Sequence, residues 1–304
     1  MFWLAILLPI KVRRLKINLV HMPANVISPV LRKPQVCSIH DVHFITNPEG
    51  RDALWRLYAR WSFRFSARYA DKILCDSHSA SEEIVNKLGA RPEKIKVIYL
   101  GLTHRTSKAS DTREAARFKP YILSVGATDP NKNFKTLVEA YALLIEKEPA
   151  FQPLLILAGP PGRDHLSLQN MIREKGLENR VKLLGGVLDP MLASLYENAS
   201  LFVYPSLCEG FGFPPLEAMH YGVPVLASRA PSIPEVLGDA AIFFNPKDSS
   251  EISDKILSLF SDPELMKKLA AAGVKRAARY SWEKTAADTI NAYRSILENQ
   301  HLSI

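Results

Sequence analysis

The chain has 304 residues and a mass of 34.0 kDa, with 47% hydrophobic residues, 23% charged residues and a mean hydropathy of −0.04. These ordinary values exclude a disordered chain, a collagen-like repeat and a small disulfide scaffold. At ~100–200 residues per domain, the length predicts two domains. The three cysteines are scattered without a CxxC pair. This argues against a structural zinc site and favours a reducing cytoplasm.

The net charge of +8 is distributed unevenly. Residues 1–120 hold 21 basic and 10 acidic residues, whereas residues 121–304 hold 18 and 21. The basic excess therefore belongs to the N-terminal part and predicts an anionic partner there, such as a membrane lipid, a phosphorylated acceptor or nucleic acid. No recognised nucleic-acid motif accompanies the charge, so we expect no nucleic acid among the partners.

The chain opens with an apolar run followed by basic residues, MFWLAILLPIKVRRLK. The run ends at Ile10, about half of the ~20 residues that span a bilayer. The charges follow the run, which is the reverse of a signal peptide. We expect a buried N-terminal helix of the first domain. The alternative is a short interfacial helix anchored by Phe2 and Trp3.

Apolar stretches then alternate with amphipathic ones, which is typical of an α/β protein with parallel sheets. Several apolar stretches are continuous, as expected where helices cover both faces of a sheet. We predict strands over 35–39, 72–75, 95–99, 121–125, 153–158, 181–184, 201–204, 223–227 and 241–244. We predict helices over 53–69, 81–88, 134–147, 165–175, 190–197, 214–219, 250–261, 263–280 and 282–299.

Residues 101–119, GLTHRTSKASDTREAARFK, are polar and carry no strand pattern. We interpret them as an interdomain linker, because a fresh strand follows Pro120. The predicted domains are 1–118 and 119–304. We expect the last helix to pack back toward the first domain.

The predicted helix over 53–69 carries arginines at every fourth position, which places four guanidinium groups along one face. These are Arg56, Arg60, Arg64 and Arg68, interleaved with Trp55, Trp61, Phe63 and Phe65. Two interpretations stay open. The face could dock on an anionic membrane, where each basic residue contributes about 1 kcal/mol. It could also be a solvated basic face over an aromatic core.

The most informative stretch is 201–222, LFVYPSLCEGFGFPPLEAMHYG. A buried strand leads into a loop with two glycines, then into prolines and a helix. Glycine lets a backbone approach a ligand closely, and the start of a helix presents amides and partial positive charge. Glu209 and Glu217 bracket this loop, and carboxylates accept hydrogen bonds from paired sugar hydroxyls. Taken alone, the two glutamates could equally be a solvated loop residue and a partner of the helix dipole.

This stretch resembles the E-x7-E signature of glycosyltransferase family 4, the group 1 glycosyltransferases, which have two Rossmann-like domains in the GT-B arrangement. Further segments resemble the family in the same order, among them SVGATDPNKNFKTLVEAYALL, LLILAGPPG and GVPVLASRAPSIPEVLGDAAIFFNPKD. Upstream, SIHDVHFITNPEG and RYADKILCDSHSASEEIVNKLGARPEKIKVIYLGL resemble the later half of the family's N-terminal domain. The subgroup most similar in character is that of bacterial polysaccharide mannosyltransferases.

The resemblance implies transfer of a sugar from a nucleotide-diphosphate donor with retention of configuration. It implies that Glu209 contacts donor-sugar hydroxyls, that Glu217 contacts ribose hydroxyls and that Lys132 neutralises the leaving diphosphate. No cofactor or metal is implied, because an ammonium and helix N-termini can stabilise the developing charge. No acidic pair resembling a metal-binding DxD motif is present in the sequence.

Other residues are assigned by the same resemblance. His40, after a predicted strand, matches the family histidine that reaches the donor sugar and its phosphate, and it lies at the ligand edge of an open α/β sheet. Asp189 lies where some relatives contact the base, which points toward guanine. Donor contacts are also implied at residues of the two glycine-containing loops: Gly126, Gly210, Phe211, Gly212 and Phe213.

The chain departs from the family pattern at three places. Ala127 replaces a frequent arginine and Asn131 a second basic residue, which leaves Lys132 to neutralise the diphosphate nearly alone. Family members also begin with a strand and a glycine-rich loop, and no Gly-Gly turn precedes Asn18. We therefore expect a shortened N-terminal domain, which could belong to a naturally short member, a fragment or a partner-dependent subunit.

The sequence thus predicts a metal-independent retaining glycosyltransferase on the cytoplasmic side, peripheral at the inner membrane face. It would move a hexose from GDP-mannose, or second from a UDP-sugar, to a glycan or lipid-linked acceptor in surface polysaccharide or glycolipid synthesis. The alternative is a non-catalytic nucleotide-sugar-binding or scaffold subunit that needs a partner. A nicotinamide dehydrogenase is disfavoured because no G-x-G-x-x-G turn follows a strand.

Overall fold

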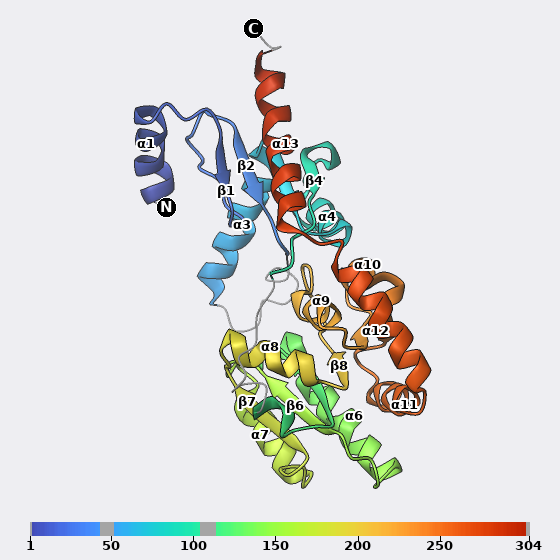
Figure 1. The fold of residues 1–304 in the computed structure, drawn as a ribbon. Helices are drawn as coiled ribbons and strands as arrows, with labels where there is room; N and C mark the ends of the chain where they lie inside the picture. Colours follow the sequence, from blue (N-terminus) through green and yellow to red (C-terminus); the bar gives the residue numbers. More distant parts are fainter. Residues whose placement is uncertain (1, 43–51, 104–113, 302–304) are drawn as a thin grey trace. The chain divides into compact units, whose positions relative to one another are not determined.

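The structure, a computed structural model, describes residues 2–42, 52–103 and 114–301 (Figure 1). Its internal contacts divide the chain into two compact units. The first comprises Met1–Gly101 together with Ser281–Ile304, and the second comprises Leu102–Tyr280. The second unit thus begins before residue 119, and the last helix belongs to the first unit. Most of the expected linker, residues 104–113, lies outside the described residues.

The first unit is built on a four-stranded parallel sheet in the order β1-β2-β3-β4. Its strands are β1 (Val20–Met22), β2 (Gln35–Ser38), β3 (Lys72–Cys75) and β4 (Ile95–Val97). The sequence pattern predicts β2 to β4 but not β1. With three half-buried residues, β1 is too short to show a periodicity.

Helices cover both faces of this sheet. Because side chains alternate along a strand, Cys37 and Ile73 face one way and Val36 and Leu74 the other. The first pair belongs to a core that includes Phe63. This face is covered by α3 (Ala53–Tyr69), α4 (His78–Glu83) and the π-helix η2 (Ile84–Leu88), and the 3-10 turn η3 (Pro92–Lys94) precedes β4. The second pair packs on Ala292 and Ile296 of α13 (Trp282–His301).

The N-terminal segment forms the π-helix η1 (Trp3–Leu7) and the helix α1 (Leu8–Arg14). The prediction of a buried N-terminal helix is wrong for most of this segment. Only Leu8 and Val12, one turn apart, are buried, while Phe2 and Trp3 are exposed. The apolar residues of this segment run around the whole helix, so a single packing contact cannot cover them.

The second unit contains a six-stranded parallel sheet in the order β10-β9-β8-β5-β6-β7. Its strands are β5 (Tyr121–Val125), β6 (Leu154–Ala158), β7 (Val181–Gly185), β8 (Leu201–Tyr204), β9 (Val225–Ser228) and β10 (Ala241–Phe244). The direction of strand addition reverses between β5 and β8. Ligands of open α/β sheets bind outside the carboxyl ends of the strands at such a reversal.

Helices again cover both faces of the sheet. The main core joins β5, β6 and β8 to α6, α7 and α11. On the other face, the buried Tyr121 donates a hydrogen bond of 2.6 Å to the carbonyl of Leu195 in α8. The helices are α6 (Phe134–Lys147), α7 (His165–Glu174), α8 (Asp189–Asn198), α9 (Phe213–His220), α10 (Ile233–Leu237), α11 (Ser249–Phe260) and α12 (Pro263–Ala277), with 3-10 turns η4 (Pro130–Lys132) and η5 (Gly238–Ala240). Among the helices that the structure describes, none combines the length and the apolar character needed to cross a membrane.

Candidate active site

Lys132 and Glu209 meet at the strand reversal of the second unit. Lys132 ends the turn after β5, and Glu209 lies in the loop after β8. The Lys132 Nζ and Glu209 Oε1 atoms are 2.6 Å apart, and the two side chains are 19% and 15% exposed. The topology of the sheet therefore brings together two residues that are 77 positions apart in the sequence.

Glu209 is held by one oxygen only. Its Oε1 accepts hydrogen bonds from Tyr204 Oη at 2.8 Å and from Ser206 Oγ at 2.6 Å, in addition to the Lys132 ammonium. Within the described part of the chain, Oε2 accepts no hydrogen bond. The carboxylate is thus fixed in orientation while its second oxygen remains able to accept a ligand hydroxyl.

Tyr204 joins the two charged groups. The Lys132 ammonium donates to its hydroxyl at 3.1 Å, and the hydroxyl donates to Glu209. Burial, followed by the charge of Glu209, raises the pKa of Tyr204 well above its ordinary value. The phenol therefore keeps its proton and remains a donor to the carboxylate.

Backbone geometry positions the two loops. A side chain at Gly126 would place its Cβ 3.1 Å from Lys132 Cδ, so this glycine leaves room for the lysine stem. Asn133 adopts the left-handed conformation and its Nδ2 donates to the carbonyls of Pro205 at 3.0 Å and Pro246 at 2.7 Å. Asparagine tolerates this conformation better than most residues. The turn that carries Lys132 is thereby tied to the loop that carries Glu209.

Glu217 lies in α9 and is 8% exposed. Its Oε2 accepts a hydrogen bond of 2.9 Å from Tyr196 Oη of α8. The helix starts after Gly212, whose φ of 93° favours glycine and where a Cβ would lie 2.5 Å from Ile233 Cδ1. The structure thus places Glu209 before the start of α9 and Glu217 within it.

The remaining predicted donor residues differ in their surroundings. The ring of Phe211 is buried and packs edge-on against Tyr280 and Phe213, with centroids 5.6 and 5.2 Å away. Phe211 can therefore offer a ligand its backbone rather than its ring. Gly210 is half-buried in the same loop, and Asp189 is the exposed first residue of α8.

His40 belongs to the first unit, where it follows β2. Its Nδ1 lies 2.8 Å from Asp76 Oδ2, and its Nε2 lies 3.1 Å from the carbonyl of Pro23. Both neighbours are acceptors, so both ring nitrogens must carry hydrogen to satisfy them. The hydrogen bond with Asp76 is the main cause that raises the pKa of His40 above its ordinary value. The site therefore favours an imidazolium cation.

His21, unassigned from the sequence, lies in β1 beside this pair. Its ring nitrogens are 2.6 Å from Tyr293 Oη of α13 and 2.8 Å from Ser38 Oγ. Burial and then the charge of His40 lower the pKa of His21. A neutral His21 can accept from one hydroxyl and donate to the other, so it links α13 to the sheet.

Four polar partners of the predicted site escaped the sequence analysis: Asp76, Tyr196, Tyr204 and Ser206. Asp76 had a usable signal, because it follows the predicted strand 72–75 just as His40 follows 35–39. Tyr196 had none, because its partner Glu217 lies in another helix. Tyr204 and Ser206 lie five and three residues before Glu209, but nearness in the sequence does not show which way a hydroxyl points. Among the described residues, no group of three or more His, Cys, Asp and Glu side chains is arranged to hold a metal ion.

Comparison with known proteins gives the same picture. Residues 1–105 match the family described as Glycosyltransferase Family 4, and residues 108–276 match Glycosyl transferases group 1. The O-antigen chain mannosyltransferase B of Escherichia coli is 34% identical over 85% of this chain and 70% of that protein. The serotype-specific mannosyltransferase WbdA of the same species is 28% identical over 87% of this chain, which is only 34% of its own length.

The fold has a similar counterpart among solved structures. Sucrose-phosphate synthase from Thermosynechococcus elongatus superposes with a TM-score of 0.79 at 20% identity, covering 95% of this chain and 76% of that one. At this identity the likeness concerns the fold alone, and it confirms the expected GT-B class of two parallel α/β sheets. Together with the two family matches, it shows that the chain belongs to glycosyltransferase family 4, the group 1 glycosyl transferases, and is a glycosyltransferase.

Proposed function

We propose that the protein is a retaining transferase that moves mannose from GDP-mannose to a glycan or lipid-linked acceptor, in surface polysaccharide or glycolipid synthesis at the cytoplasmic face of a membrane. A UDP-sugar is the second candidate donor. The names of the mannosyltransferase relatives support the sugar and the pathway class. The observation that carries the proposal is the carboxylate of Glu209, fixed through Oε1 and without a hydrogen-bond partner for Oε2 in the described part of the chain.

The donor would lie along the loop after β8 and the start of α9. In this scheme Glu209 Oε2 accepts hydrogen bonds from hydroxyls of the donor sugar, and Glu217 accepts those of the ribose. The backbone from Gly210 to Phe213 approaches the donor closely, because no side chain intervenes at the two glycines. Asp189 would contact the base. Gly126 would let the donor approach the turn after β5.

The transfer breaks the bond between the anomeric carbon and the β-phosphate oxygen. A bond forms from the acceptor hydroxyl oxygen to the same carbon on the same face, and the hydroxyl proton passes to the departing phosphate oxygen. Negative charge develops on the diphosphate, and a fixed ammonium stabilises it most where water is excluded. Lys132 supplies this charge in the second unit, and the imidazolium of His40 is the corresponding cation of the first unit. In this scheme the residues of the chain supply the positive charge without a metal.

Calorimetric titration of the full chain with GDP, UDP and ADP tests the donor. Selective binding of GDP followed by release of mannose from GDP-mannose would support the proposal. Selective binding of UDP would identify a UDP-sugar as the donor and leave the proposed site unchanged. Selective nucleotide binding without turnover on any acceptor would instead favour the partner-dependent scaffold subunit.

A further inference from the structure

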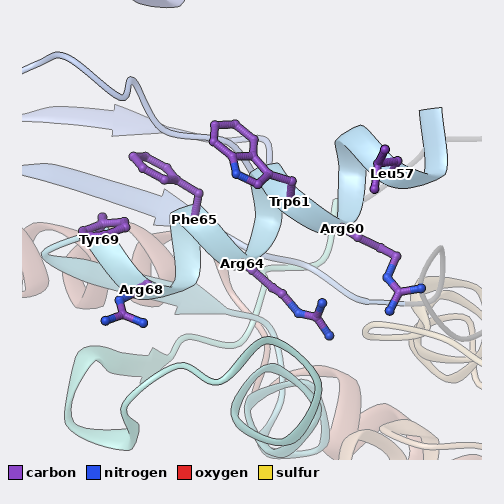
Figure 2. A pocket seen from close by; sticks show the side chains of 7 residues that line it. All are labelled: Leu57, Arg60, Trp61, Arg64, Phe65, Arg68 and Tyr69. Atoms are coloured by element: carbon purple, nitrogen blue, oxygen red, sulfur yellow. The ribbon is translucent and has the colours of Figure 1, made fainter. Parts of the chain in front are cut away.

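The outward side of α3 carries a shallow groove, which we call the α3 outer face (Figure 2). Figure 2 shows aromatic rings along one edge of the helix and guanidinium groups along the other. The face is made of Leu57, Arg60, Trp61, Arg64, Phe65, Arg68 and Tyr69. All seven belong to one helix of the first unit, so the face is defined within that unit alone.

The large apolar side chains of α3 lie on its outward side, where a surface helix normally carries polar residues. The residues that pack on the sheet are mostly small: Ala59, Ser62, Phe63, Ser66 and Ala67. By contrast, Trp61 is 52% and Tyr69 57% exposed. The rings of Trp61 and Phe65 stack with their centroids 5.4 Å apart, and the ring centroids of Phe65 and Tyr69 are 4.7 Å apart. A continuous row of rings on an outward face marks an interaction surface.

The charges of this helix are equally unusual. Its four arginines are exposed, and residues 53–69 contain no Asp or Glu. Within the described part of the chain, none of the four guanidinium groups forms an ion pair or a hydrogen bond, and that of Arg68 lies 5.8 Å from the ring centroid of Tyr69. Other exposed helices of the chain, α12 and α13, differ in this respect. The exposed lysines Lys267 and Lys284 pair with carboxylates one turn away on their own helices. The α3 outer face therefore presents uncompensated positive charge beside its rings.

The N-terminal helices add a second surface of the same composition to this unit. Its exposed apolar residues are Phe2, Trp3, Ile6, Leu7 and Ile10, and its basic residues are Lys11, Arg13, Arg14 and Lys16. One short segment joins it to α3. The amide of Ile27 donates to Ser66 Oγ of α3 at 3.0 Å, and Ser28 Oγ donates to the carbonyl of Leu4 at 2.7 Å.

We propose that the α3 outer face docks the protein on an anionic phospholipid bilayer, with the N-terminal helices as a second contact. Arginines pair with lipid phosphates, while tryptophan and tyrosine rings prefer the headgroup level of a bilayer. Single-stranded nucleic acid also combines stacking with positive charge. Lipid fits better, because Leu54 and Leu57 are 81% and 68% exposed and add aliphatic surface that base stacking does not use. This inference is independent of the proposed donor.

Flotation of the full chain with phosphatidylglycerol-containing vesicles tests the surface. The variant R60Q/R64Q/R68Q should lower the partition coefficient roughly 100-fold at low salt, about fivefold for each arginine removed. The control K267Q/K268Q/K275Q makes the same charge change on the exposed surface of α12 and should bind like the unaltered protein. Added salt should lower the partition coefficient of the unaltered protein until it approaches that of the triple-arginine variant, since salt screens charge.

A second measurement tests whether the α3 outer face itself contacts the lipid, as opposed to a nonspecific attraction of the basic unit to anionic vesicles. Brominated lipids should quench the fluorescence of Trp61, and W61F should lose that part of the quenching. Equal binding to neutral phosphatidylcholine vesicles would overturn the proposal, as would unchanged binding by the arginine variant. Tighter binding of single-stranded RNA than of vesicles would replace the lipid by nucleic acid. A circular dichroism spectrum and a melting temperature like those of the unaltered protein show that the arginine variant is folded.

Discussion

In each unit of the molecule, a basic side chain of the predicted site lies beside a carboxylate past the carboxyl ends of parallel strands. In the first unit His40 and Asp76 are 2.8 Å apart, and in the second unit Lys132 and Glu209 are 2.6 Å apart. Strand topology explains both, because neighbouring parallel strands end at the same edge of a sheet. The pairs differ in the cation. Histidine changes its charge between pH 5 and 8, whereas the lysine side chain does not normally do so.

The surroundings of the two carboxylates differ as well. Asp76 has His40 as its charged partner, and burial works against its charge. Glu209 receives an ammonium and two hydroxyls on a single oxygen. The first pair should therefore respond to pH, and the second should respond to the removal of individual donors.

The largest expected effect is that of Lys132→Ala. Removing a positioned donor to a developing anion costs roughly 10²–10³ in kcat. We expect a loss of this size in steady-state transfer assays, with a smaller change in the binding of the nucleoside diphosphate. Lys135→Ala is the matched control, because Lys135 lies three residues along and pairs with Asp164. Transfer at the normal rate in the Lys132 variant would show that the diphosphate is neutralised elsewhere.

The next effect concerns nucleotide affinity. Glu217→Ala removes the carboxylate proposed to hold the ribose, and hydrogen bonds to charged groups contribute about 1.5–3 kcal/mol each. We expect the affinity for GDP to fall roughly 10–100-fold by calorimetry. Glu197→Ala, an exposed glutamate on α8, should bind GDP normally. An unchanged affinity in the Glu217 variant would contradict its assignment.

The His40–Asp76 pair should show itself in the pH dependence of stability and activity more than in the rate at neutral pH. Since Asp76 raises the pKa of His40, the folded state binds the proton more tightly than the unfolded chain does. The stabilisation is then complete below the unfolded pKa of about 6.5 and is lost as pH rises through the raised value. Asp76→Asn should reduce this dependence of the melting temperature on pH.

The same variant should move the pH profile of transfer. If the imidazolium contacts the donor phosphate, activity falls as His40 loses its proton, and Asp76→Asn shifts that fall to lower pH. His40→Asn should abolish the alkaline limb altogether. A profile that stays in place in both variants would leave His40 with a structural role only.

The sequence predicts much of this arrangement, and the limits have physical causes. Apolar stretches locate β2 to β10, and several of these stretches are continuous, as in β8, because a strand buried on both faces has no polar side. The resemblance supplies Lys132 and Glu209, and the sheet order brings them together. Tyr204 and Ser206 lie five and three residues before Glu209, but their nearness in the sequence could not show that both hydroxyls turn toward its carboxylate. The exposure of Trp61 was equally hidden, since helical spacing shows which residues share a face but not which face is covered.

The smallest expected effect is that of Tyr204→Phe, and it tests whether the second pair is held by shape as well as by charge. Phenylalanine fills the same buried space, so the core keeps its packing, and Glu209 Oε1 keeps the bonds from Lys132 and Ser206. The loss of one hydroxyl that joins both groups corresponds to about 1 kcal/mol, or several-fold in rate. Because the phenol keeps its proton throughout the neutral range, this loss should be the same at every pH at which His40 titrates. Measuring kcat of Tyr204→Phe across that range thus separates the two pairs. A loss that grows with pH would show that they act as one coupled system, whereas a constant loss would show that each unit sets its own charge.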